Sequence, residues 1–445
     1  MPDNSPYDVI VVGAGLAGLT AGYYLSKKGS QVLILEESAR AGGMVYSSLK
    51  QGYLLEHGPQ TVQPKKELIE LLSDIGILDQ AIYSNPKAPR YIWQQNTLKK
   101  VPMGPAELLK TNLLSLKAKV RLLYEPFISA QNINNENIFD FAQRRMGIEV
   151  AKNLISPFVS GVWAGDPHLL DIQYSFPQLK NFELNHGSIF KGIAHSLKEK
   201  KAPLPKGLLS FPKGLGEIPQ KLSTLLKEKI RFNSSVENIS FQNDEWALLL
   251  KSGETLITKQ LIIASPAHKI QGTLQGVSKE LSENLKRLEY AAVKVLSLGF
   301  DESLFTKNTN GFGFLVAPDE KKSFLGCIFS SHLFPNRAPQ GKKLLSLFIG
   351  GTTQKDKFNQ NEDTLLSDIL KNLTDMLGLN GPPEFIHWTR YDKAIPQYNQ
   401  NYSQVIDTIN DIEIKYPTLH FIGNMRGGIS VGDVVKTAKE RVLSS

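Results

Sequence analysis

Tyr7–Gly18 reads YDVIVVGAGLAG, an apolar strand that runs directly into a glycine-rich turn. A helix is predicted to follow the turn, and a second apolar strand, Gln31–Leu35, ends at Glu36. In such a strand–turn–helix unit the glycines let a pyrophosphate approach the backbone at the helix N-terminus. A carboxylate at the end of the second strand binds ribose hydroxyls and repels a 2′-phosphate. The predicted dinucleotide contacts are Gly13, Gly15, Gly18 and Glu36.

Two more glycine motifs follow Glu36. They are Arg40-Ala41-Gly42-Gly43 and the stretch from Gly52 to Pro59, which reads GYLLEHGP. Nicotinamide enzymes do not need these additions, and the combination resembles the flavoprotein family of amine oxidases, phytoene desaturases and protoporphyrinogen oxidases, all of which bind FAD. The alternative is a glycine turn between an ordinary strand and helix. The resemblance adds five predicted FAD contacts, namely Arg40, Gly42, Gly43, Gly58 and Pro59.

Length and composition restrict the class of protein. The chain has 445 residues and is 41% hydrophobic, which is too long for one compact core, so we expect two or three domains. The single cysteine, Cys327, excludes an intrachain disulfide and a cysteine-rich metal site, and it favours the reducing cytoplasm. We predict no metal site. The sequence shows no signal-peptide pattern and no apolar run long enough to span a bilayer.

Positive charge is concentrated in one region. Residues 90–206 hold 16 Lys and Arg against 9 Asp and Glu, a net charge of +7 out of the total of +8. Within it, residues 106–123 alternate apolar and basic residues at roughly helical spacing. Such a helix can lie on an anionic membrane surface, or it can be a solvated face over a buried stripe. Nucleic acid is not expected as a partner, because no recognition motif accompanies the charge.

The C-terminal segment is predicted to return to the first domain. Leu419–Asn424 is a strand that enters a glycine-rich turn, and a helix begins near Val431. Exposed amides at that helix start favour negative charge near a bound flavin. Asp433 is predicted to hydrogen-bond the ribityl or phosphate region, with helix capping as the alternative role. The predicted cofactor contacts here are Gly423, Val431 and Asp433.

One stretch resembles a narrower group within the flavin amine oxidase superfamily. Ser156–Pro167 reads SPFVSGVWAGDP, and it is similar to a block found in the oxygen-dependent protoporphyrinogen oxidases. Matching pieces occur in the same order along nearly the whole chain. The resemblance implies an α/β fold, α+β overall, with a Rossmann-like FAD-binding domain, a β-rich substrate domain and a helical membrane-associating domain. The FAD is expected to be non-covalent.

The expected domains are discontinuous in sequence. The FAD-binding domain is expected to comprise residues 1–82, 207–267 and 408–445. The substrate domain is expected to comprise residues 83–93 and 268–407, and the helical domain residues 94–206.

The same resemblance implies substrate contacts. Arg90 corresponds to an arginine that pairs with a porphyrinogen propionate, which suits a bidentate guanidinium. Gly161 corresponds to a glycine whose carbonyl faces the pyrrole NH groups. Three residues, Phe312, Leu315 and Phe348, correspond to apolar walls around the ring. One further residue belongs to the cofactor site: Val236 corresponds to a position whose backbone contacts the adenine of FAD. The alternatives are that Arg90 is a surface arginine, that the three apolar residues only pack in the core, and that Val236 is a plain strand residue.

The resemblance implies FAD-dependent oxidation of protoporphyrinogen IX to protoporphyrin IX in haem biosynthesis, with oxygen as acceptor and hydrogen peroxide as product. Flavin N5 is expected to accept hydride from a meso carbon, so no side chain is assigned a catalytic role. Coproporphyrinogen III is the alternative substrate. An amine oxidase and a non-catalytic flavin-binding protein are more distant alternatives. We expect a cytoplasmic protein associated peripherally with the membrane, in contact with the next haem-pathway enzyme. The oligomeric state stays open, with a homodimer among the options.

Overall fold

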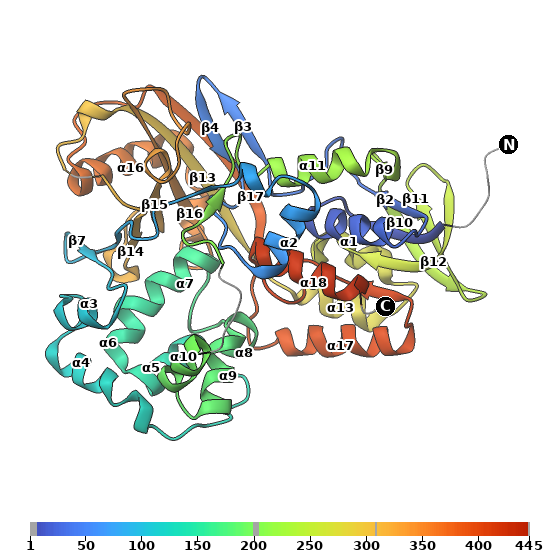
Figure 1. The fold of residues 1–445 in the computed structure, drawn as a ribbon, viewed down its shortest axis with the longest axis horizontal. Helices are drawn as coiled ribbons and strands as arrows, with labels where there is room; N and C mark the ends of the chain where they lie inside the picture. The colour runs from blue at the N-terminus through green and yellow to red at the C-terminus, as the bar shows by residue number, and fades with distance from the viewer. Residues whose placement is uncertain (1–6, 199–203, 308, 444–445) are drawn as a thin grey trace.

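The structure is a computed structural model that describes residues 7–198, 204–307 and 309–443. The parts of the expected domain segments that fall on other residues lie outside the described residues. Figure 1 shows an α/β region around the first sheet on the right, a second sheet at the upper left and a helical region at the lower left. The first sheet takes strands from both ends and from the middle of the chain, so the three regions are not consecutive in sequence.

The first sheet has parallel strands at its centre. Strand β1 pairs in parallel with β2 and β12, and β18 pairs in parallel with β12. These strands are almost continuously apolar, because helices or other strands cover both of their faces. The members of the sheet are β10 (Val236–Gln242), β11 (Glu245–Leu250), β12 (Thr255–Ile263), β1 (Tyr7–Val12), β2 (Val32–Leu35), β9 (Ile230–Arg231) and β18 (Leu419–Phe421).

Two apolar cores enclose this sheet. Val9, Val11 and Ile34 belong to the core on one side, and Ile10 and Leu33 to the core on the other. The helices of the first core are α1 (Leu16–Lys27), α2 (Lys66–Asp74), α11 (Glu217–Leu225) and α18 (Val431–Leu443). Those of the second include α12 (Ala267–Ile270), α13 (Lys279–Arg287) and α17 (Tyr402–Lys415), together with helices of the helical region described below. Alternation of buried side chains along the strands therefore builds a layered α/β unit.

The second sheet is mostly antiparallel. One of its faces packs on α16 (Glu362–Leu377) through Leu365, Ile369 and Leu373. Its strands are β17 (Phe385–Pro396), β13 (Tyr290–Asp301), β16 (Lys342–Gly350), β15 (Gly326–Phe329), β14 (Gly313–Val316), β6 (Arg90–Gln94) and β7 (Thr97–Lys100). Two small antiparallel pairs complete the strands: β3 (Ser47–Lys50) with β4 (Tyr53–Glu56), which is a hairpin, and β5 (Ile82–Tyr83) with β8 (Leu209–Ser210), which are far apart in sequence.

The helical region is held together partly by buried charge. Arg144 donates to Glu136 at 2.8 Å and to Glu183 at 2.6 Å, and Arg145 donates to Glu125. Because Arg145 and the three carboxylates are almost completely buried and Arg144 is largely buried, removing one partner would leave an uncompensated charge. The helices are α3 (Pro105–Lys110), α4 (Leu116–Leu123), α5 (Ile138–Met146), α6 (Ile148–Val150), the π-helical turn η3 (Ala151–Ile155), α7 (Ser156–Trp163), α8 (Ile172–Ser175), α9 (Pro177–His186) and α10 (Ile189–Lys198).

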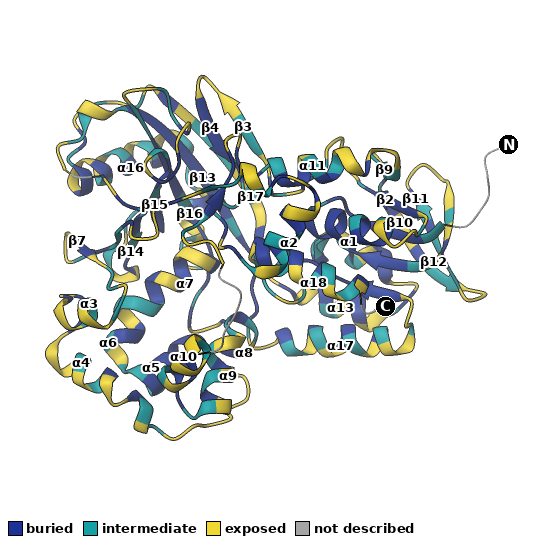
Figure 2. Cartoon of the chain, viewed as in Figure 1, coloured by how far each residue is buried: buried dark blue, intermediate teal, exposed yellow. Residues whose placement is uncertain are grey.

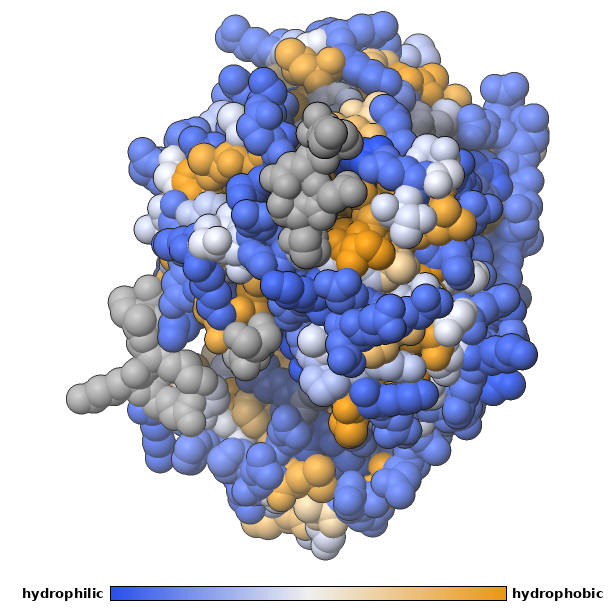
Figure 3. Space-filling model, turned by 90° about the vertical axis from the view of Figure 1, so that its right-hand side faces the viewer, coloured by the Kyte–Doolittle hydropathy of each residue, from blue (hydrophilic) through white to orange (hydrophobic). Residues whose placement is uncertain are grey.

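Short elements connect the rest. The 3-10 turns are η1 (Leu78–Gln80), η2 (Glu125–Phe127), η4 (Lys227–Lys229), η5 (Gln271–Leu274), η6 (Glu302–Leu304) and η7 (Pro318–Glu320), and the remaining helices are α14 (Ser330–Leu333) and α15 (Lys355–Asn359). Figure 2 shows the buried residues concentrated in the two sheets, whereas α3 and α4 carry long exposed stretches. Figure 3 shows that the face at the right-hand end of Figure 1 is largely hydrophilic, with apolar residues in separate groups.

The structure confirms the expected fold class, with a Rossmann-like sheet and a second, β-rich sheet. Two local expectations were wrong. Residues 402–407, at the end of a segment expected to be β-rich, form the start of α17, because this segment packs an apolar helical face on the first sheet's core. Residues 97–100, in the segment expected to be helical, form strand β7. None of the helices in the described ranges is both long and apolar enough to cross a bilayer.

Candidate active site

The segments that follow three parallel strands meet at one edge of the first sheet. Because β1, β12 and β18 run parallel, the segments that follow them, at Gly13, Ser265 and Gly423, lie at the same edge. The φ angle of Gly13 is +107°, and a Cβ there would lie 2.8 Å from Ser265 Oγ. Gly15 caps α1, and a Cβ on Gly15 would have no neighbour within 4 Å. The turn thus presents open space at a helix N-terminus, as a phosphate cradle requires.

Gly18 fixes how closely α1 lies on this turn. A Cβ at Gly18 would be 1.9 Å from the carbonyl oxygen of Gly13. No side chain can occupy that space, because the obstacle is backbone rather than a flexible side chain.

Glu36 and Val236 lie near each other at the end of β2. The Glu36 carboxylate accepts hydrogen bonds from Ala14 N at 2.8 Å and Ser38 N at 3.0 Å. The Ser234 amide donates to the Glu36 carbonyl at 2.8 Å, and Val236 begins β10 two residues later. The two residues expected to contact the adenosine half of FAD are therefore on neighbouring segments.

The second and third glycine motifs pack onto the first. The Gly42 amide donates to the Ala14 carbonyl at 2.8 Å, and a Cβ on Gly43 would lie 3.3 Å from the Cα of Gly15. A Cβ on Gly58 would lie 2.0 Å from the Met44 carbonyl oxygen, so Gly58 and the adjacent Pro59 belong to the same assembly. Arg40 is exposed, and its guanidinium lies 4.6 Å from the centre of the Tyr46 ring.

Asp433 is in the first turn of α18, as expected, but its carboxylate already has interaction partners within the chain. It forms an ion pair with Lys65, and it accepts a hydrogen bond from the Ser430 hydroxyl. The Ser430 hydroxyl in turn accepts from the Asp433 amide at 3.2 Å, so Ser430 supplies the N-terminal side-chain cap. No local pattern pointed to Lys65, which lies far away along the chain. Val431 begins the helix and is buried.

Four of the five expected substrate residues gather over one face of the second sheet. In-register pairing of Arg90 with Gly313, of Leu315 with Gly326 and of Gly326 with Phe348 places Arg90, Leu315 and Phe348 on the same face. Gly161 on α7 lies above them, since a Cβ there would be 2.3 Å from a Leu315 methyl group. We call this set the substrate face.

The fifth residue, Phe312, lies beside Arg90. The Arg90 guanidinium is 5.0 Å from the centre of the Phe312 ring. Within the described part of the chain it has no hydrogen-bond acceptor or carboxylate partner, although the residue is half-buried. Burial lowers the pKa of this guanidinium, because the charge loses solvent. An anionic ligand would supply the missing partner.

The substrate face adjoins the cofactor motifs. Phe348 and Met44 pack on the same small apolar cluster, which contains Val295 and Leu325. Met44 directly follows Gly43 of the second glycine motif. The open cradle at Gly15 and the unpaired cation at Arg90 are therefore the two ends of one region.

The cradle fits FAD in its geometry and its charge. Comparison with known proteins agrees, because the model of the family described as flavin containing amine oxidoreductase matches residues 16–441. The chain belongs to this family. It is an oxidoreductase, and its cofactor is FAD.

Individual relatives cover almost the whole chain. Protoporphyrinogen oxidase 2 of Arabidopsis thaliana is 30% identical, over 95% of this chain and 91% of the relative. Coproporphyrinogen III oxidase of Bacillus subtilis is 27% identical, over 98% of this chain and 97% of the relative. Among solved structures, a candidate protoporphyrinogen oxidase from Exiguobacterium superposes with a TM-score of 0.80 at 21% identity, covering 98% of both chains.

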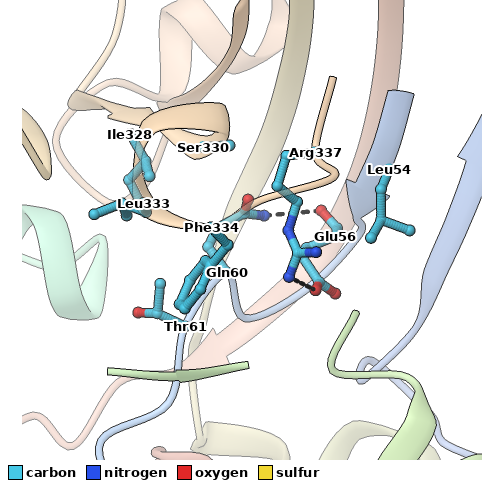
Figure 4. A pocket seen from close by; sticks show the side chains of 9 residues that line it. All are labelled: Leu54, Glu56, Gln60, Thr61, Ile328, Ser330, Leu333, Phe334 and Arg337. Atoms are coloured by element: carbon cyan, nitrogen blue, oxygen red, sulfur yellow. Dashed lines mark hydrogen bonds and ion pairs between the residues drawn. The ribbon is translucent and has the colours of Figure 1, made fainter. Parts of the chain in front are cut away.

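Figure 4 shows a small cavity of about 10 Å³, room for about one water, whose lining residues Leu333 and Phe334 pack in the same apolar cluster as Phe312. It contains a buried ion pair that sequence analysis did not find, Glu56 with Arg337, whose closest N–O distance is 3.5 Å. Glu56 also accepts from the Leu215 amide at 2.8 Å, and Arg337 donates to Ser210 Oγ at 2.6 Å. The pair thus ties β4, the segment after β8 and the second-sheet region together.

Glu56 makes stability depend on pH. Burial raises the pKa of its carboxyl to about 7, against the effects of its hydrogen bonds and of Arg337. Since the folded chain then holds this proton more tightly than the unfolded chain, stability falls as the pH rises from about 4.5 to about 7. Replacing Glu56 by glutamine should remove this slope. The free energy of unfolding of the variant should gain about 3 kcal/mol relative to the wild type between pH 4 and pH 8. Urea unfolding across this range measures it, and a constant difference would contradict it.

Proposed function

We propose that this chain oxidises a porphyrinogen to the porphyrin, with protoporphyrinogen IX as substrate and coproporphyrinogen III as the alternative. The observation that carries the proposal is the unpaired, half-buried guanidinium of Arg90 at the border of an apolar sheet face next to the FAD cradle. A flat, greasy macrocycle with carboxylate substituents matches both features. Relatives that bear these two names are similar to this chain over nearly its whole length.

The four residues of the substrate face and the adjacent Phe312 each have a role in the proposal. Arg90 binds a propionate and sets the orientation of the ring. Phe312, Leu315 and Phe348 pack against the macrocycle and exclude water. Gly161 lets the backbone of α7 approach the pyrrole NH groups, because it has no side chain. When bound, FAD supplies the hydride acceptor and passes electrons to oxygen. The protein therefore contributes position and electrostatics rather than a catalytic side chain.

The apolar walls favour protoporphyrinogen IX over coproporphyrinogen III. The second substrate carries propionates where the first has vinyl groups, and burying a further carboxylate without a partner is costly. The test is to supply the purified protein with each porphyrinogen in air and follow porphyrin fluorescence. Faster turnover of protoporphyrinogen IX supports this choice, and faster turnover of coproporphyrinogen III reverses it. No turnover of either refutes the proposal.

An amine oxidase of the same fold is the nearest competing function. Many such enzymes attach FAD through a cysteine near the C-terminal glycine turn, but here that turn reads Met425-Arg426-Gly427-Gly428. Peroxide formation from a polyamine, without oxidation of a porphyrinogen, would favour the amine oxidase. A non-catalytic flavin-binding protein would bind FAD and oxidise neither.

We further propose the expected domains and cofactor contacts as working assignments. Residues 1–82, 207–267 and 408–445 supply the first sheet and the glycine turns at Gly13, Gly42, Gly58 and Gly423, which supports a single FAD-binding domain. Strand β7 lies beside β6 in the second sheet, so that sheet extends past residue 93. Oxygen as acceptor, contact with the next enzyme of the haem pathway and a homodimer are part of the same proposal.

We also propose that the helical region binds an anionic membrane surface. Leu116, Val120 and Phe127 are 78%, 61% and 74% exposed, which is unusual for a row of large apolar side chains. Lys117 and Lys119 lie among them on α4; Lys117 is exposed and Lys119 is partly buried. Arg121 does not contribute to the basic face as the sequence suggested, because its guanidinium donates to the carbonyls of Arg144 and Arg145. The apolar residues of α4 fall into two groups: Ala118 and Leu122 are buried, and the others face solvent.

Membrane binding predicts the effect of removing charge. The triple substitution Lys110→Gln, Lys117→Gln and Lys119→Gln should weaken binding to phosphatidylserine vesicles about 100-fold, at about 1 kcal/mol per lysine. Co-sedimentation at low and high salt measures it. Lys227→Gln with Lys229→Gln, on η4, is the control and should bind as the wild type does. Unchanged binding of the triple variant would contradict the membrane proposal.

A further inference from the structure

Two buried tyrosines hold the C-terminal glycine turn from behind. The Tyr398 hydroxyl donates to the Asn424 carbonyl at 2.6 Å and accepts from the Gly428 amide at 3.3 Å. The Tyr402 hydroxyl donates to the Met425 carbonyl at 2.7 Å. Between them the two hydroxyls bind three backbone groups of the turn that links β18 to α18.

The two rings form a rigid support. They stack with centroids 4.0 Å apart and an interplanar angle of 12°. Tyr398 is 1% exposed and Tyr402 is 3% exposed. Rotation of either ring would cost packing, so the hydroxyls have fixed positions. Burial raises the pKa of both tyrosines, which keeps the hydroxyls protonated as donors.

The same support is anchored in the helical region. The Trp163 ring of α7 packs edge-on against Tyr398 with centroids 5.0 Å apart. The Asp171 amide donates to the Tyr398 carbonyl at 2.8 Å, and the Gln397 side chain donates to the Trp163 carbonyl at 3.0 Å. Tyr398 is therefore held from one side by α7 and holds the glycine turn on the other.

The turn in question forms part of the FAD cradle. A Cβ on Gly423 would lie 3.5 Å from Ala17 in the first turn of α1, and Gly428 lies against Asp433 in the first turn of α18. Shifting the turn would therefore shift the N-terminus of α18 relative to that of α1. Amides at both N-termini lose their alignment with a bound phosphate or flavin when this happens.

We propose that Tyr398 is a positioning residue for FAD, which acts through Asn424 and Gly428 to fix the N-terminus of α18 at the cofactor. Tyr402 supports the same turn through Met425. The inference concerns the cofactor alone and stands or falls independently of the porphyrinogen proposal.

The test is FAD binding to the FAD-free full-length protein, measured by quenching of flavin fluorescence without any porphyrinogen. Tyr398→Phe keeps the ring and removes the hydroxyl, so its Kd for FAD should rise about 10-fold, the effect of losing about 1.4 kcal/mol of hydrogen bonding. The visible circular dichroism of the bound flavin should change with it. Tyr174→Phe is the matched control, because Tyr174 packs edge-on against Tyr402 with centroids 5.1 Å apart without bonding the turn.

The outcomes separate positioning from general stability. A purely structural role would lower the melting temperatures of the FAD-free and FAD-bound proteins together and leave the Kd within twofold of the wild type. That result would overturn the proposal. If Tyr398→Phe does not fold, Tyr402→Phe gives the same test through Met425, with the same two readings of its Kd.

Discussion

Replacing Arg90 by alanine is expected to lower kcat/KM for the porphyrinogen about 100-fold, because charge-assisted hydrogen bonds to a carboxylate contribute about 1.5–3 kcal/mol. The effect should lie near the upper end of that range. The guanidinium is half-buried beside Phe312 and has no other anionic partner among the described residues, so the substrate carboxylate would be left in an apolar setting. FAD binding should be unchanged, since Arg90 belongs to the second sheet and not to the cradle. Steady-state porphyrin fluorescence and a flavin titration measure the two quantities.

Two companion variants sharpen this result. Arg90→Lys keeps the charge but loses the planar fork, so it should recover part of the activity but not all of it. Arg287→Ala removes an exposed arginine on α13 and should behave as the wild type. Wild-type kcat/KM in Arg90→Ala, or an equal loss of FAD binding, would contradict the role given to Arg90.

Replacing Gly18 by valine is expected to abolish FAD binding, with the Kd raised by more than about 100-fold, or about 2.7 kcal/mol. A Cβ at this position would lie 1.9 Å from the Gly13 carbonyl oxygen, so α1 must move away from the glycine turn. A steric clash with backbone atoms cannot be removed by rotating a side chain, so the overpacking is strongly destabilising. The purified protein should therefore lack the yellow colour of bound flavin and should not recover it on titration with FAD.

A second glycine separates a damaged fold from a blocked cofactor site. Gly15→Ala adds a Cβ that meets no protein atom within 4 Å, so the FAD-free protein should keep the wild-type melting temperature. The same methyl group enters the space assigned to the pyrophosphate, so FAD affinity should fall. Gly272→Ala, also without a neighbour within 4 Å, is the control away from the cradle. Wild-type FAD affinity in Gly15→Ala would show that the cofactor does not approach this turn.

The parts of the fold that sequence predicted well are those encoded locally. The strand at Val9–Val12, the glycine turn after it and the helix that follows the turn, Leu16–Lys27, each have a complete pattern within a short window. The C-terminal strand and the helix beginning at Val431 were predicted for the same reason. The resemblance to known flavoproteins then grouped distant segments that no local pattern connects.

The missed features depend on contacts between distant segments. Glu56 and Arg337 are separated by most of the chain, and no local pattern marks either as half of a buried ion pair. Lys65 pairs with Asp433 across an even longer separation. Residues 402–407 were predicted wrongly because their helix is specified by packing on the first sheet's core as much as by their own sequence. The sequence did not predict that the Arg121 side chain turns inward toward α5, for the same reason.

The most direct measurement is to add protoporphyrinogen IX to the FAD-bound protein in the absence of oxygen and follow the visible absorbance of the flavin. The site described here requires the flavin band to bleach at a rate that saturates with porphyrinogen, and to return, with porphyrin fluorescence and peroxide, when oxygen is admitted. Coproporphyrinogen III run in parallel tells which of the two substrates fits better. A flavin that stays oxidised with both porphyrinogens, or that is bleached only by an amine, would contradict the assignment of this chain as a porphyrinogen oxidase.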